Sequence, residues 1–148
     1  MTSTDTSTSS PNSIIARLDA GMEITRDNAV DVLDALDYEA SQARAEFDLI
    51  DDPAQRAELY QRGAINQERQ ALAYELRPGR ARDKTGPAAL NRWGARLCAA
   101  GAEIERLRAR AAAHDRDLPD PRMLLADVHD DRAVEALLRL YTLAASHQ

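Results

Sequence analysis

The strongest constraint in this sequence is a run of mostly apolar side chains from Leu90 to His114 that recurs at alternating steps of three and four residues. This spacing places its members on one side of an α-helix and is typical of the seam between two packed helices. We therefore predict a long helix that begins at Pro87 and continues to about residue 115. The repeat consists of Leu90, Trp93, Leu97, Ala100, Ile104, Leu107, Ala111 and His114.

A second seam with the same spacing indicates another long helix after Thr25, a residue suited to cap a helix N-terminus. Asp52 and Pro53 are typical of a helix start, and that helix is expected to end near Leu76. The connection between these two helices is short, which predicts that they pack antiparallel. The second seam consists of Ala29, Leu33, Leu36, Ala40, Ala43, Phe47 and Ile50.

Shorter apolar segments lie at both ends of the chain. Residues 13–20 predict a short helix that Gly21 ends. A last helix is indicated by an apolar face, and a break is expected near Asp130. The face consists of Val134, Leu137, Leu138, Tyr141 and Ala144. We therefore expect an all-α fold with four main helices as two antiparallel coiled-coil-like hairpins, and a short extra N-terminal helix.

The domain organisation follows from composition. Residues 1–12 are rich in serine and threonine, which predicts a disordered tail, and 13–148 are expected to form a single helical-bundle domain. The core would consist of alanine and leucine, with one tryptophan and one phenylalanine, which argues against a β-sandwich. No apolar run is long enough to cross a membrane, so a cytoplasmic location is expected.

Charge divides the chain unevenly. The net charge is −6, but residues 1–76 carry −9 and residues 77–148 carry +3. The basic half begins with a connector, 77–87, that Pro and Gly residues flank on both sides. We predict that its cations form an electrostatic contact with a partner, although a solvated connector is the simpler alternative. These cations are Arg77, Arg80, Arg82 and Lys84.

Nucleic acid binding is an alternative use of the basic region 77–116. Five further arginines could extend the connector into a basic stripe that neutralises phosphates. The acidic pI near 5.0 and the lack of interleaved aromatic residues argue against this alternative. The five are Arg92, Arg96, Arg106, Arg108 and Arg110.

Catalytic patterns are weak. The segment 79–85 looks like a phosphate-binding loop, but Asp83 stands where a glycine should precede the lysine. The spacing from Arg108 to His114, and from Arg122 to His129, resembles that of HEPN-type helical ribonucleases, which are kept as a second alternative. Metal binding is not predicted, because the aspartates around His129 fit helix capping better than a metal site.

Other reactive side chains also favour structural interpretations. Cys98 is the only cysteine, which excludes an internal disulfide and a cysteine-based zinc site. Asp27, Asp31 and Asp34 fall on one side of the predicted helix and are interpreted as a solvated face. No catalytic residue, cofactor or metal site is therefore predicted.

The sequence as a whole predicts a non-enzymatic helical protein–protein interaction protein, either an oligomer or an adaptor. Short chains rich in alanine and arginine are also common among accessory proteins of phages and mobile elements. The partner is expected to be another protein or a second copy, with no membrane involved. The predicted oligomer contact is the seam residues Leu90, Trp93, Leu97, Ile104 and Leu107.

Overall fold

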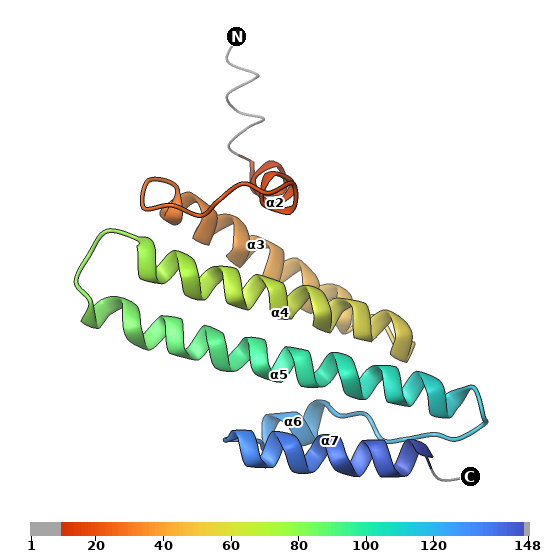
Figure 1. Ribbon diagram of the computed structural model, residues 1–148. Helices are drawn as coiled ribbons and strands as arrows, with labels where there is room; N and C mark the ends of the chain where they lie inside the picture. Colours follow the sequence, from red (N-terminus) through yellow and green to blue (C-terminus); the bar gives the residue numbers. More distant parts are fainter. Residues whose placement is uncertain (1–9, 147–148) are drawn as a thin grey trace. The chain divides into compact units, whose positions relative to one another are not determined.

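The computed structural model describes residues 10–146, and this part of the chain contains α-helices and no strands (Figure 1). The prediction of an all-α fold is therefore confirmed. Residues 10–146 form the helices α2 (Pro11–Asp19), α3 (Ala29–Phe47), α4 (Pro53–Leu76), α5 (Arg82–Ala112), α6 (Arg122–Ala126) and α7 (Asp131–Ser146).

The described residues group into two compact units. Unit one contains 10–46 and 65–95, and unit two contains 47–64 and 96–146. The helices α4 and α5 each contribute one part to each unit. The expectation of a single domain over 13–148 stays a prediction.

The N-terminal helix α2 begins earlier than the sequence pattern indicated. The Ser13 N–H donates to the Ser10 hydroxyl at 3.2 Å, and Pro11 takes the first helical position, where its missing N–H costs no hydrogen bond. Residues 10–12 are thus a helix cap and a first turn, which corrects the predicted tail boundary. The remainder of that tail, 1–9, lies outside the described residues.

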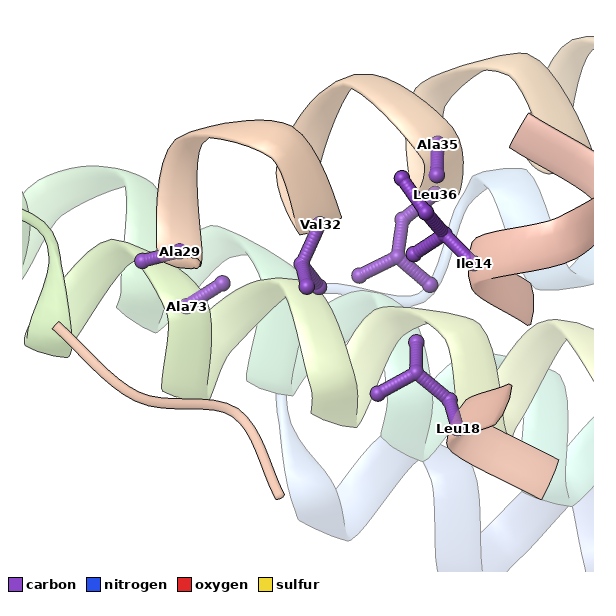
Figure 2. Close-up of a cluster of buried hydrophobic side chains, with 7 residues drawn as sticks. All are labelled: Ile14, Leu18, Ala29, Val32, Ala35, Leu36 and Ala73. Atoms are coloured by element: carbon purple, nitrogen blue, oxygen red, sulfur yellow. The ribbon is translucent and has the colours of Figure 1, made fainter. Parts of the chain in front are cut away.

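The core of unit one joins three helices (Figure 2). Ile14 and Leu18 of α2 pack with residues of α3 and with Ala73 of α4. Val32 and Ala35 are buried beside the predicted seam residues, so the buried side of α3 is wider than a strict heptad seam. The α3 members of the cluster are Ala29, Val32, Ala35 and Leu36.

Side-chain amides join α4 to both of its neighbours in unit one. The Asn66 amide donates to the Leu36 carbonyl and to Glu39, each at 2.9 Å, and so links α4 to α3. The Asn91 amide donates to Gln67 at 2.6 Å and links α5 to α4. Buried polar groups cost free energy when they lack partners, so these bonds fix which residues face one another.

In unit two, α4 and α5 pack closely where a glycine faces a larger side chain. Gly63 of α4 lies against the Cys98 side chain of α5, and Gly101 of α5 lies against the Tyr60 ring of α4. Residue numbers rise along α4 as they fall along α5, so these two helices are antiparallel. Asp52 caps α4 as predicted, because its carboxylate accepts the Gln55 N–H at 3.0 Å.

The predicted second hairpin is wrong, because α5 and α7 run parallel. Arg96, in the middle of α5, pairs with Asp131 at the start of α7, while the Arg116 guanidinium beyond the end of α5 donates to the Ala145 carbonyl near the end of α7. The long segment 113–130, which includes α6, returns the chain before α7 begins (Figure 1). Only a short connection forces neighbouring helices to be antiparallel.

The predicted helix start at Pro87 is also wrong. The helix α5 begins at Arg82, Pro87 lies inside it, and the connector therefore shortens from 77–87 to 77–81. Proline has no N–H to donate to the Asp83 carbonyl one turn earlier. The Arg77 guanidinium donates to that carbonyl at 3.1 Å, which replaces the lost helical hydrogen bond.

Gly101 is expected to tolerate no side chain. An added Cβ would lie 2.7 Å from two carbons of the rigid Tyr60 ring, so Gly101→Ala should lower the free energy of unfolding by about 1–3 kcal/mol. Gly94→Ala is the matched control, because its Cβ would meet only the flexible Gln67 amide at 3.1 Å, and a change within about 1 kcal/mol is expected. Urea denaturation of both variants measures the difference, and equal effects would contradict the close packing at Gly101.

Candidate functional site

The four predicted contact cations do not share one environment. Arg80 and Arg82 are exposed, whereas Arg77 and Lys84 are half-buried. The Arg77 guanidinium lies over the Tyr74 ring, 4.6 Å from its centroid. Arg77 therefore stabilises the start of α5. Arg80 and Arg82 are the two most exposed of the four cations, and Arg82 lies 3.8 Å from the exposed Asp83 carboxylate.

The five arginines proposed as a nucleic-acid stripe are largely engaged within the molecule. Arg92 pairs with Glu75 of α4, and Arg96 pairs with both Asp131 and Glu135 of α7. Arg106 donates to Gln61 at 2.8 Å and Arg108 donates to Glu105 at 2.6 Å, while Arg110 is exposed. These internal acceptors reduce the positive charge that a phosphate backbone would meet.

The predicted oligomer seam of α5 is buried over only part of its length. Ile104 and Leu107 are buried, and Trp93 and Leu97 are half-buried. Leu90 is 73% exposed in the single chain, and its predicted role in an oligomer contact stays a prediction. The described residues of unit one therefore leave this N-terminal end of the seam open.

The exposed part of this seam also carries a positive charge. Arg82, Gly86, Leu90 and Trp93 follow one another at helical steps of four, four and three residues, which places them on the same side of α5. A side chain added at Gly86 would meet open space. We call these four residues, all of unit one, the open stripe.

An acidic side of α3 lies elsewhere on unit one. Asp27, just before the helix, and Asp31 and Asp34 within it are exposed, in agreement with a solvated face. Two large apolar side chains accompany them, Val30 with 54% exposure and Tyr38 with 45%. We call Val30, Asp31, Asp34 and Tyr38 the acidic face.

Unit two contains a group of charged residues that the sequence interpretation did not predict. Glu105 of α5 is fully buried, and Arg56 of α4 is 4% exposed. Arg56 pairs with Asp120 at 2.7 Å, and its guanidinium lies 3.9 Å from Oε2 of Glu105. Arg108 holds the other Glu105 oxygen at 2.6 Å. We call Arg56, Glu105, Arg108 and Asp120 the charge cluster.

Burial and pairing shift the pKa values of the charge cluster in opposite directions. Burial raises the pKa of Glu105, and the nearby Arg108 and Arg56 only partly oppose this. Burial also acts to raise the pKa of Asp120, but hydrogen bonds from the Arg122 backbone N–H and the Arg56 guanidinium outweigh it and lower that pKa to about 2. Burial raises the pKa of the adjacent Tyr60 hydroxyl. Glu105 Oε2 makes no hydrogen bond among the described residues.

The charge cluster fits a structural role better than a catalytic one. Glu105 has no exposed surface that a substrate could reach. Arg108, proposed as a ribonuclease residue, is held by Glu105 and by the Leu118 carbonyl, while His114 is exposed beyond the end of α5. Cys98 is half-buried, and burial raises its pKa, which disfavours the reactive thiolate.

Residues 10–146 contain neither a metal-binding group of side chains nor a membrane-spanning helix. No group of three or more His, Cys, Asp or Glu side chains in this range is arranged to hold a metal ion. No helix in the same range is both long and apolar enough to cross a membrane.

The described residues define an all-α protein with two compact helical units. No family model matches the chain, and no match is found among the curated proteins or the solved structures.

Proposed function

We propose that this chain is a non-enzymatic helical protein that acts through protein–protein contact, as an oligomer or an adaptor. The observation that carries the proposal is the 73% exposure of Leu90 at the end of a regular seam. A large apolar side chain in a periodic stripe marks an interaction surface more strongly than a scattered exposed leucine does. The exposed Arg82 on the same side of α5 would set the orientation of a partner.

Related parts of the proposal concern arrangement and location. We include a coiled-coil-like contact between α3 and α4, which the bond from Asn66 to the Leu36 carbonyl supports. A cytoplasmic location and a role as an accessory protein of a phage or mobile element belong to the same proposal. Nucleic acid binding and ribonuclease activity are less favoured, because the arginines that they need have internal acceptors.

Copurification from native cells tests the proposed function. Leu90→Asp should reduce recovery of the bound protein, identified by mass, at least about tenfold, because a charge would enter an apolar contact. Leu49→Asp is the matched control, since Leu49 is 87% exposed outside the seam and should leave recovery unchanged. Equal recovery with wild type and Leu90→Asp would reject the open stripe as a contact.

A further inference from the structure

The open stripe and the acidic face are complementary surfaces on the same chain. The stripe presents apolar Leu90 and Trp93 beside Arg82, with exposed Arg80 in the connector just before α5. The acidic face presents apolar Val30 and Tyr38 beside the exposed carboxylates of Asp31 and Asp34. Each surface therefore combines large apolar side chains with charges of one sign, and the two signs are opposite.

Neither surface is covered within unit one. Leu90 is 73% exposed and Val30 is 54% exposed, although both belong to the same unit. The contact that their complementarity permits is therefore not made inside this unit. A partner that covers the open stripe has to bring apolar side chains and negative charge on one side of a helix.

We propose that the partner on the open stripe is a second copy of this chain, which docks its acidic face there. A parallel contact between two open stripes would bring Arg80 and Arg82 of the two copies together, and like charges oppose it. An antiparallel contact would place Arg82 of each copy near Trp93 of the other, with no carboxylate of the stripe to pair with it. Docking of the acidic face places aspartates against these arginines and apolar side chains against Leu90 and Trp93. This inference rests on the proposed function and specifies its partner.

The symmetry of the contact limits the assemblies. The contact joins two different surfaces, so two copies can make it twice around a two-fold axis and close as a dimer. If the geometry does not close, the same contact adds further copies in a ring or an open chain. In either case association requires both surfaces and weakens as salt screens their charges.

A charge exchange tests the proposal by sedimentation velocity at micromolar concentrations. Arg80→Glu with Arg82→Glu gives a chain with two acidic surfaces, and Asp31→Lys with Asp34→Lys gives a chain with two basic surfaces. Each variant alone should dissociate at least about tenfold more readily than wild type, and an equimolar mixture should associate again. Circular dichroism verifies that both variants are helical, and raising the salt concentration on wild type gives a second readout that requires no substitution.

Each outcome decides the inference. Reassociation in the mixture supports it. It is overturned by a wild-type chain that stays monomeric, by association that salt does not weaken, or by a mixture that stays dissociated while both variants are folded. A monomeric wild type whose partner capture still depends on Leu90 would leave the proposed function standing and remove only the second copy as its partner.

Discussion

Arg56→Met is expected to lower the free energy of unfolding by about 3–5 kcal/mol at neutral pH, because it leaves the buried Glu105 with Arg108 as its one remaining cation and removes the Arg56 guanidinium from Asp120. Arg56 is 4% exposed, pairs with Asp120 at 2.7 Å and lies near the fully buried Glu105. Its Nε also donates to the Ile50 carbonyl at 2.7 Å, a bond that methionine cannot make. Urea denaturation followed by circular dichroism measures the loss.

Arg69→Met is the matched control for this prediction. Arg69 also pairs with an aspartate, Asp19 at 3.0 Å, but both side chains of that pair have solvent contact. A pair of this kind contributes no more than about 1 kcal/mol to stability. Equal losses in Arg56→Met and Arg69→Met would contradict a structural role for the charge cluster.

The loss in Arg56→Met should also depend on pH. Removal of Arg56 takes away a charge that opposes the raised pKa of Glu105, so that pKa rises further. When folding raises the pKa of an acid, the protonated acid stabilises the folded chain at pH values below the unfolded-state pKa. This stabilisation is lost as the pH rises through the folded-state pKa. The variant should therefore be closer in stability to wild type at about pH 5 than at about pH 7.

Asp120 changes its protonation over a lower pH range, so it does not affect the comparison between about pH 5 and pH 7. Its pKa is lowered to about 2 in the folded chain, against an ordinary value of 3.8. A lowered pKa gives stability that is present above the unfolded-state value and is lost as pH falls toward the folded-state value. This change lies below about pH 4, so a loss in Arg56→Met that is constant between about pH 5 and 7 would contradict the role given to Glu105.

Apolar spacing and capping residues predicted most of the helices, but they did not predict where α5 begins or in which direction α7 runs. The start of α5 depends on the Arg77 guanidinium, which donates to the carbonyl that Pro87 leaves without a helical donor. The parallel course of α7 depends on the length of the segment 113–130 and on contacts such as Arg96 with Asp131. Neither contact has a signal in local sequence.

The charge cluster could not be predicted from apolar periodicity, because the helix sides that form it carry mostly polar residues and glycine. On α5, Cys98, Gly101, Glu105 and Arg108 recur at three, four and three residues, and on α4 Arg56, Tyr60 and Gly63 recur at four and three. These are seam spacings filled by glycine, charged and aromatic residues. Gly94 and Gly101, seven residues apart, were the available signal, since each glycine lies where a side chain of α4 approaches α5.

The length of a seam also says nothing about the length of the helix that covers it. The helix α5 has 31 residues and α7 has 16, so α7 cannot cover the whole of one side of α5. Arg96 pairs with Asp131, the first residue of α7, within unit two, whereas Leu90 belongs to unit one. A regular heptad pattern therefore does not tell which of its members the chain itself buries, and Leu90 is left 73% exposed.

Ile104→Asp is expected to unfold unit two, with a loss of more than about 4 kcal/mol in the free energy of unfolding. Ile104 is fully buried, so the variant loses its apolar burial and must desolvate a carboxylate. The next residue, Glu105, is already a fully buried carboxylate, and a second negative charge beside it adds repulsion. Circular dichroism should report a large loss of helix in the absence of denaturant.

Two variants separate the effect of burial from the effect of charge at this seam. Ile104→Val removes one methyl group from the same buried position and should cost about 0.5–1.5 kcal/mol. Leu90→Asp places the same charge in the same repeat at a position 73% exposed and should change stability by less than about 1 kcal/mol. Because Ile104 is buried within a single chain, its substitution should act on folding, whereas that of Leu90 should act on the proposed association. A folded, cooperative Ile104→Asp chain would contradict the buried position of Ile104.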